Sequence, residues 1–375
     1  MLGSDGNKGV FCVSLLMIAT PACRGAVSNA MPDATSTQPS DASIASASDV
    51  PDSGALRPWI DTHAHPVGLH TECTTKACAD AVVDMLDRFA VRRTILIHPP
   101  AAGSTPKSGE SNVRNTVALR PDRFFLGVGG CDLNSSIQAT AGTSQVTNEV
   151  RDAFAAKTND LLAGDGAVVV GETTALHLSY EPAHPFEEIA PNAQLFKDLA
   201  DLVVTKDVAI DFHMDAVKQT MNTPSFYTQR SPNNPASIQG NIEAFSDLLA
   251  HNRKTRFVWA HVGRDTTGDM TPALVDSLLV ANENLFIQVH AVFGPLQSSN
   301  AIVDESFAIR PEWLELLKKY PDRAVVGTDS FFTGTESDAK GLDGMQRFLQ
   351  GLPADLANRI GCENPVRIYK LPSGC

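Results

Sequence analysis

The sequence WIDTHAHP at residues 59–66 ends the first strand-like run of the chain and carries two histidines, His63 and His65, one residue apart. Side chains at positions i and i+2 lie on the same face of a β-strand, so both imidazoles can reach one ion. A lone histidine after a strand is more often a core residue. The pair, which follows Asp61, instead predicts a metal centre at the carboxyl end of this strand.

Four later apolar runs also end on a group that can bind a metal or transfer a proton. These groups are Glu172 after AVVVG, His213 after VAIDF, His261 after FVWA and Asp329 after AVVGT. A ligand set of nitrogen and oxygen without thiolate favours Zn, Mn, Fe or Ni over a Cys-rich structural zinc site. We therefore predict one or two divalent ions, with zinc favoured.

Eight short apolar runs alternate with helical stretches from about residue 56 onward. The expected strands are Trp59–His63, Thr94–His98, Phe124–Val128, Ala167–Glu172, Val208–His213, Phe257–His261, Leu285–Val289 and Ala324–Asp329. The expected helices are Ala79–Phe89, Val150–Leu162, Ala193–Val204, Ile242–His251, Pro272–Ala281 and Pro311–Lys319, with final helices from Ala354 onward. Continuously apolar strands are typical of parallel sheets covered by helices, and eight such units predict an α/β fold, a closed (β/α)8 TIM barrel. An open doubly wound sheet is the alternative, but it would need a Gly-rich phosphate turn that the sequence lacks.

Composition narrows the class of protein further. Among 375 residues, 43% are hydrophobic and 19% charged, which is typical of a globular chain with a sizeable core. The net charge of −13 disfavours sequence-independent binding to nucleic acid, which needs a basic surface. An aromatic content of 6% disfavours a platform for an extended polymer and favours a small substrate.

The first 55 residues have a different character from the rest. Residues 1–26 contain Lys8, an apolar stretch at 10–20 and then Cys23, a pattern that resembles a secretory leader of the lipoprotein type with Cys23 as the lipidated residue. Residues 27–55 are rich in Ser, Ala and Asp and predict a disordered linker before a barrel at 56–375. We expect an exported protein, a periplasmic or cell-surface lipoprotein, that contacts a membrane only through Cys23; a cytoplasmic protein is the alternative.

Two cysteine pairs could form disulfides. Cys73 and Cys78 lie close together in one loop, and Cys362 could reach Cys375. Both pairings would suit an oxidising compartment, whereas reduced thiols are the alternative. Cys131 is left over and is expected to be a buried thiol at a strand end.

The strand-end pattern resembles the amidohydrolase superfamily, in particular its amidohydrolase-2 group, from residue 59 to about 371. Members of this group are metal-dependent barrel enzymes, mostly hydrolases with some decarboxylases. The resemblance implies that His63, His65, His213 and Asp329 bind metal and that His261 is either a ligand or a catalytic histidine.

Glu172 has a resemblance of its own. It lies in the sequence VGETT, which is similar to the Gly-Glu element of TatD-like deoxyribonucleases and implies a binuclear site. The aspartate that those enzymes carry shortly afterwards is missing here. A carboxylate on the fourth strand could bridge two ions or could orient a ligand histidine by a hydrogen bond. The absence of a lysine on that strand sets aside a carbamylated-lysine bridge.

Asp329 is the candidate for proton transfer. In a barrel the eighth strand adjoins the first, so its carboxylate would face His63 and His65. There it could hold the metal and accept a proton from a bound water, whose pKa a metal lowers from about 16 towards ~7. A helix-capping or turn aspartate is the alternative reading of this residue.

Several other residues are candidates for substrate binding. Arg264, three residues after His261, could clamp a carboxylate or phosphate, or could form a surface salt bridge. Asn233 and Asn234 in the sequence SPNNP could bind substrate carbonyls or hydroxyls, or could simply form a turn. His177 is expected in the loop after the fourth strand, facing substrate or solvent. His98 and His290 could line the pocket without binding metal.

Four hypotheses for the function follow from these residues. The first is a metal-dependent hydrolase that uses metal-activated water on an amide, lactone or ester-type bond of a small substrate. The second is a non-oxidative decarboxylase of the same superfamily, with one ion and Arg264 on the substrate carboxylate. The third is a TatD-like phosphoesterase or nuclease, which the acidic charge disfavours. A non-catalytic binding protein would not need the whole ligand set.

Overall fold

The computed structural model describes residues 56–67, 72–100, 109–143, 145–164, 166–291, 300–372 and 375, and the predicted leader, linker and Cys23 lie outside them. Seven of the strands in this part of the chain form one parallel sheet in which each pairs with the next. They are β1 (Trp59–His65), β2 (Val91–Leu96), β3 (Phe124–Gly129), β4 (Ala167–His177), β6 (Ala209–Met214), β9 (Phe257–Val262) and β10 (Leu285–Val289).

The eighth strand closes the sheet and is split into β11 (Ala324–Val326) and β12 (Ser330–Phe331). β11 pairs with β10, whereas β12 pairs with β1, in both cases in parallel. Between the two halves the N–H of Asp329 donates to the carbonyl of His63 at 2.9 Å. The strand order therefore returns to its start, and the predicted (β/α)8 barrel is confirmed.

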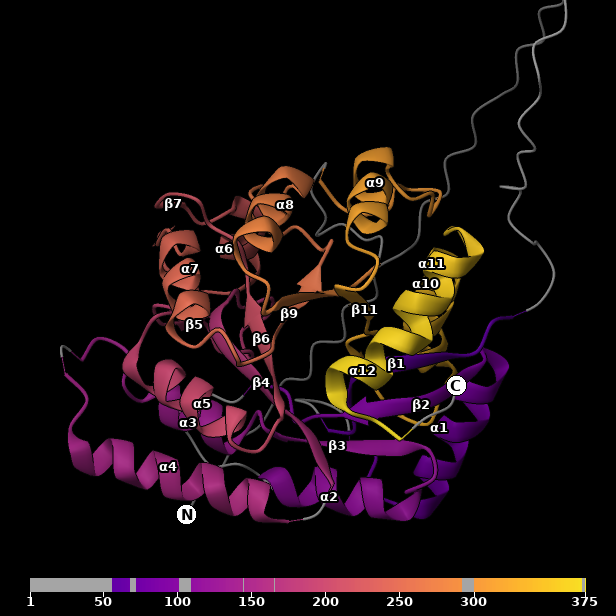
Figure 1. Ribbon diagram of the computed structural model, residues 1–375, viewed down its shortest axis with the longest axis horizontal. Coiled ribbons are helices and arrows are strands. Elements are labelled where there is room, and N and C mark those ends of the chain that lie inside the picture. Colours follow the sequence, from indigo (N-terminus) through magenta and orange to yellow (C-terminus); the bar gives the residue numbers. More distant parts are fainter. Residues whose placement is uncertain are drawn as a thin grey trace, which may run out of the picture. The chain divides into compact units, whose positions relative to one another are not determined.

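Helices follow the strands and surround them (Figure 1). They are α1 (Lys76–Arg88), α2 (Gly109–Leu119), α3 (Asp132–Gln138), α4 (Asn148–Ala163), α5 (Gln194–Val204), α6 (Ser225–Arg230), α7 (Ile242–His251), α8 (Pro272–Ala281), α9 (Pro311–Lys319), α10 (Ala339–Gln350), α11 (Ala354–Asn358) and α12 (Asn364–Tyr369), with a π-helical turn at Arg359–Glu363 and a 3-10 turn at Glu336–Asp338. Threonine side chains cap the amino ends of three of them, α1, α4 and α8, as the sequence chemistry of helix starts requires. The predicted bounds of α7, α8 and α9 are confirmed, whereas α2, α3, α6 and α10 were not predicted.

The largest difference from the predicted strands is the length of β4. The strand does not end at Glu172 but continues to His177, because β6 pairs with it along one side and β5 (Glu187–Glu188) pairs antiparallel with its last residues. The prediction that His177 lies in the loop after this strand is therefore wrong. The extension carries the strand beyond the rim of the barrel.

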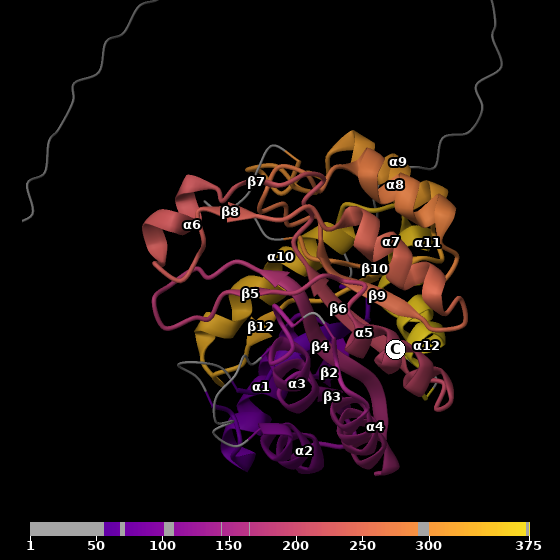
Figure 2. The ribbon, with the colours of Figure 1, turned by 90° about the vertical axis from the view of Figure 1, so that its left-hand side faces the viewer.

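The loop after β6 adds a second feature at the rim. It contains α6 and the short antiparallel pair β7 (Met221–Asn222) and β8 (Ser237–Ile238). Figure 2 shows these three elements together, away from the helices that cover the strands. They belong to a loop that leaves the carboxyl end of β6, which is the end of the barrel where the predicted site residues lie.

The interior of the barrel is apolar below the site. Side chains such as Ile60, Ile95, Val169, Val258 and Val325 come from five different strands and form one buried cluster. Ile368 and Tyr369 of α12 pack against the same cluster and cover it from below. The predicted site residues lie at the opposite end of the strands.

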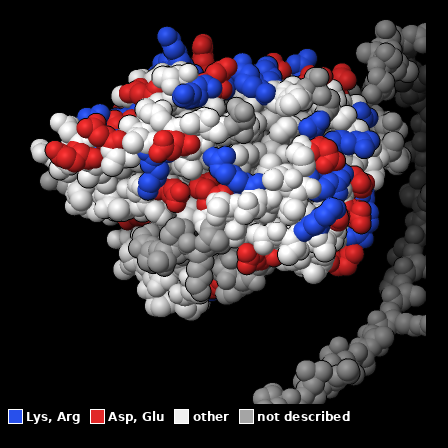
Figure 3. Space-filling model, turned by 90° about the horizontal axis from the view of Figure 1, so that it is seen from below, with Lys and Arg blue, Asp and Glu red and all other residues white. Residues whose placement is uncertain are grey.

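Two disulfides join the cysteine pairs named above, Cys73 with Cys78 and Cys362 with Cys375, while Cys131 is buried and free. Burial raises the pKa of the Cys131 thiol to about 12, so this cysteine is a poor nucleophile. Among the described residues, no helix has the length and apolarity to cross a membrane. Acidic and basic side chains are interspersed on the face that Figure 3 shows.

Candidate metal centre

The six predicted ligands converge at the carboxyl end of the barrel. His63 and His65 come from the last residues of β1, His213 from those of β6 and His261 from those of β9, whereas Glu172 lies within β4 and Asp329 in the gap between β11 and β12. All are buried or nearly so. The sequence therefore identified residues that the fold brings together.

The backbone is strained at two of these positions. His261 and Asp329 have positive φ angles of 60° and 51°, a left-handed backbone conformation that residues other than glycine rarely adopt. The N–H of His261 donates to the Oε1 of Gln288 at 3.0 Å, which helps to hold this conformation. Such strain is typical of positions where a side chain must point in one direction for function.

Hydrogen bonds fix the orientation of the first histidine pair. The Nδ1 of His63 donates to the Oδ2 of Asp211 at 3.0 Å, and the Nδ1 of His65 donates to the carbonyl of Ile97 at 3.0 Å. Because carboxylate and carbonyl oxygens only accept, the donors must be the Nδ1 atoms. Both Nε2 atoms are thereby left to face the centre of the barrel, where they lie 3.2 Å apart.

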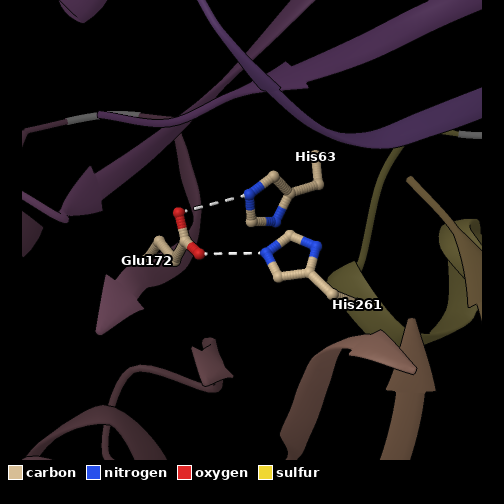
Figure 4. Close-up of side chains that lie close together, drawn as sticks. All are labelled: His63, Glu172 and His261. Carbon is tan, nitrogen blue, oxygen red and sulfur yellow. Dashed lines mark hydrogen bonds and ion pairs between the residues drawn. The ribbon is translucent and has the colours of Figure 1, made fainter. Parts of the chain in front are cut away.

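Glu172 lies between His63 and His261, with one carboxylate oxygen towards each (Figure 4). Its Oε2 is 3.4 Å from the Nε2 of His63 and 3.6 Å from the Nε2 of His65. Its Oε1 contacts the Nδ1 of His213 and lies 3.0 Å from the Nε2 of His261. One carboxylate therefore presents one oxygen to each histidine pair, which is the arrangement that a bridging ligand needs.

Asp329 completes the first group and also faces outward. Its Oδ1 is 3.1 Å from the Nε2 of His65 and 3.9 Å from the Nε2 of His63. Its Oδ2 is 3.1 Å from the Nη1 of Arg264 and 4.0 Å from the Nδ1 of His290. The Asp329 carboxylate thus contacts His63 and His65 through one oxygen and Arg264 through the other.

The histidines and carboxylates of the centre shift one another's pKa values. Burial opposes ionisation of Glu172 and Asp329, but the neighbouring histidines outweigh it and hold the pKa of each carboxyl well below its usual value. Burial also opposes protonation of His63, yet the carboxylates of Asp211 and Glu172 raise its pKa well above the ordinary range. Both carboxylates are therefore ionised at neutral pH and available as ligands.

The donor set fits a divalent cation. Ligand atoms of His63, His65 and Asp329 lie within 4.8 Å of one another, and so do those of His63, Glu172 and His261. These histidine nitrogens and carboxylate oxygens are the donors that zinc and similar ions bind in catalytic sites. The Nδ1 of His261 is buried without a hydrogen-bond partner among the described residues. The two groups share His63, whose Nε2 can bind only one ion, so the residues present suit a divalent cation at this centre.

His290 is a member of the centre that the sequence did not assign as a ligand. Its ligand atoms lie within 4.8 Å of those of His261 and Asp329, so it forms a third potential ligand group. Burial lowers the pKa of His290 well below its ordinary value, so its imidazole is neutral at pH 7. It follows β10 directly, and position at a strand end was the signal that pointed to it.

Asp211 was missed by the sequence analysis. It lies two residues before His213 on β6, is fully buried, and orients His63 through the hydrogen bond described above. A charged residue inside an otherwise apolar strand was the available signal. A carboxylate that accepts a hydrogen bond from a ligand histidine fixes the ring and increases its basicity.

Replacing Asp211 with asparagine is expected to weaken zinc binding about 10- to 100-fold, because the amide no longer supplies a charged acceptor for His63. Zinc affinity measured by competition with a chelator would check this. Asp201→Asn is a matched control, since Asp201 is exposed and pairs with His251 at the surface. Equal zinc affinities for wild type and Asp211→Asn would refute the positioning role.

The predicted substrate residues lie in different places. A cavity beside the metal centre is lined by His177, His213, His261 and Arg264, among others. The side chains of Asn233 and Asn234 form hydrogen bonds with the backbone of the segment that follows β4. Asn233 donates to the carbonyl of His184 at 2.7 Å, and Asn234 both donates to the carbonyl of Ser179 and accepts from its N–H. Contact between these two asparagines and a substrate stays a prediction.

A larger cavity of about 630 Å³ lies elsewhere, between the end of β4 and the amino ends of α5 and α7. Its lining includes Gln194, Gln239 and Asn241, and none of the candidate ligands. Although this cavity is the larger of the two, it is therefore not the place where the candidate ligands could act.

A closed parallel barrel with histidines and carboxylates gathered at the carboxyl ends of its strands defines a metal-dependent hydrolase. The chain belongs to the amidohydrolase family, whose model, described as "Amidohydrolase", matches residues 182–371, just over half of the sequence. His213, His261 and Asp329 lie within the matched stretch, and His63, His65 and Glu172 precede it.

Solved structures give distant matches. Dihydroorotase from Campylobacter jejuni is 12% identical, with 85% of each chain covered and a TM-score of 0.46. "Amidohydrolase 2" from Bifidobacterium longum subsp. infantis is 11% identical, with 84% of this chain and 99% of that chain covered and a TM-score of 0.46. A D-hydantoinase is 12% identical, with 82% and 70% covered and a TM-score of 0.45. Among curated proteins, none matches the sequence.

Proposed function

We propose that this protein hydrolyses an amide, lactone or ester-type bond of a small substrate with two divalent ions, zinc being favoured. His63, His65 and Asp329 would hold one ion, His213 and His261 the other, and Glu172 would bridge them. The observation that carries the proposal is the position of Glu172, which presents one oxygen to each histidine pair. The TatD-like character of the segment around Glu172 stays a prediction.

When bound, such ions lower the pKa of a water and polarise a carbonyl group. The chain itself supplies the proton transfer. Asp329 is ionised and its Oδ2 contacts Arg264, which lines the cavity, so it can accept a proton from the attacking water and pass it to the leaving group. Arg264 contacts the same oxygen and orients the carboxylate. The apolar layer beneath the site limits access of water from below.

Hydrolysis of a small panel tests the proposal. The zinc-loaded protein would be given a γ-lactone, an N-acyl amide and an aryl ester, with release of acid followed by a pH indicator. We expect turnover of at least one class, loss of that turnover when a chelator removes the zinc, and recovery when zinc is added back. Turnover that persists without metal would refute the proposed chemistry.

We also propose that the enzyme works outside the cytoplasm. The two disulfides, Cys73–Cys78 and Cys362–Cys375, support this location because such bonds persist in oxidising compartments. A membrane anchor at Cys23 remains part of the same proposal.

A further inference from the structure

We infer that the substrate carries a carboxylate and that Arg264 and Tyr227 bind it beside the metal centre. This inference rests on the proposed function, because it names the class of substrate that the hydrolytic site would accept. The carboxylate is the group by which the substrate is recognised, and it is distinct from the carbonyl that is attacked.

The cavity beside the metal centre brings the necessary groups together. His213 and His261, two of the proposed ligands, form part of its wall, and Arg264 and Tyr227 form another part. The cavity is small, about 10 Å³, so a group bound in it contacts Arg264 and the wall of the metal centre at once, and a larger ligand must displace side chains that line it. A ring from Tyr180 also lines the cavity and offers a flat surface to a planar substrate.

Arg264 has hydrogen-bonding capacity to spare. A guanidinium has five N–H donors, yet among the described residues the Arg264 side chain makes one hydrogen bond, from Nη1 to the Oδ2 of Asp329 at 3.1 Å. The side chain is 22% exposed, and none of its nitrogens is both buried and unpaired among the described residues, so the remaining donors are open to solvent or to a ligand. Its backbone is fixed by a hydrogen bond from its N–H to the carbonyl of His261 at 3.0 Å. A carboxylate is the acceptor that pairs best with such a fork of donors.

Tyr227 supplies a second and independent indication. Its side chain is 3% exposed, and its hydroxyl has no hydrogen-bond partner among the described residues. A buried phenol normally finds a partner, because leaving the hydroxyl unpaired costs free energy. The Nδ2 of Asn234 donates to the carbonyl of Tyr227 at 3.1 Å and so fixes α6 in this position. The loop that was predicted to touch substrate thus positions the residue that would do so.

Asp215 also lines the cavity, but its charge is turned into the protein. Its Oδ1 accepts a hydrogen bond from the hydroxyl of Thr266 at 2.5 Å, and its Oδ2 accepts one from the N–H of Leu178 at 3.3 Å. Among the described residues that line this cavity, Arg264 is the one with a positively charged side chain. Most of its N–H donors have no hydrogen-bond partner in the part of the chain that the structure describes. Arg264 is therefore the group in the cavity wall with donors free for an anionic group.

The position of Arg264 also limits the size of the substrate. Because the guanidinium contacts Asp329 directly, a carboxylate bound to Arg264 would lie close to the group that transfers the proton. The substrate class is therefore a small, planar acid whose carboxylate is only a few bonds from the carbonyl that is cleaved.

Binding of benzoate to the zinc-loaded protein tests the inference, with benzamide as the neutral analogue of the same shape. By titration calorimetry we expect benzoate to bind about 10-fold or more tightly than benzamide, since a hydrogen bond to a charged group is worth roughly twice one between neutral groups. Arg264→Met should reduce benzoate affinity to that of benzamide, and Tyr227→Phe should reduce it about 3- to 10-fold. Arg230→Met is the matched control, because Arg230 is exposed and lies over the ring of Phe226.

Equal affinities for benzoate and benzamide, or benzoate binding that Arg264→Met leaves unchanged, would overturn the inference. Benzoate binding that disappears with the zinc and ignores Arg264→Met would overturn it as well, because the carboxylate would then bind the metal. Zinc content and melting temperature of each variant show whether it is folded. The assay measures no turnover, so benzoate binding through Arg264 can stand if hydrolysis fails, and hydrolysis can stand if benzoate ignores Arg264.

Discussion

Replacement of Asp329 by asparagine should lower the turnover number by about 100- to 10,000-fold, which is the range that a general acid–base group contributes. The amide has nearly the same size, but it cannot accept a proton from water. The strand itself should remain intact, because the N–H of residue 329 donates to the carbonyl of His63 irrespective of the side chain. Turnover of the best substrate from the hydrolysis panel would be measured per bound zinc, so that loss of metal is separated from loss of chemistry.

A surface carboxylate provides the control for this prediction. Asp322 is exposed and pairs with Arg359, so Asp322→Asn should leave turnover unchanged. If Asp329→Asn with a full complement of zinc worked within a few-fold of wild type, another group would have to carry the proton. His290, which faces Asp329 at 4.0 Å, would then be the next residue to test.

Replacement of Glu172 by glutamine should reduce bound zinc from two ions to one. Glutamine has one oxygen that accepts and a nitrogen that only donates, so it cannot present an acceptor to both histidine pairs. The first group, His63, His65 and Asp329, keeps its donors and should hold the ion that remains. Elemental analysis gives the number of ions per chain, and turnover should fall with the loss of the second ion.

Two outcomes would contradict the bridging role of Glu172. One ion in both wild type and Glu172→Gln would mean that Glu172 only orients a histidine, which fits the decarboxylase better than the hydrolase. Two ions in both would mean that other donors hold the second ion. Glu188→Gln serves as a control, since Glu188 belongs to β5 at the rim and accepts a hydrogen bond from the N–H of Gln239.

Much of the fold could be predicted because each strand carries its own signal. A run such as LFIQV at 285–289 is apolar apart from Gln288, and its predicted bounds agree with β10. The length of β4 could not be predicted, because Glu172, Thr173 and Thr174 interrupt the apolar run although all three are buried. Their burial depends on pairing with β6 and β5, which is a property of the assembled sheet.

The ligand candidates could be predicted for a similar reason. His63 and His65 share a strand face, and a parallel barrel brings strand ends together whatever the register. The roles of Asp211 and Tyr227 were missed because they depend on which side chains lie near them in the folded chain. For Asp211 the available signal was a charged residue inside a largely apolar strand. Asn234 shows the converse: its sequence context pointed to substrate, whereas its amide bonds to Ser179 and Tyr227.

A crystal structure of the zinc-soaked protein, with anomalous data at the zinc edge, tests the central claim most directly. The account predicts two anomalous peaks roughly 3.5–4 Å apart, one on each side of the Glu172 carboxylate, which is the usual spacing of a two-metal site. A single peak, or two peaks without Glu172 between them, would contradict the bridged centre on which the proposed hydrolysis rests.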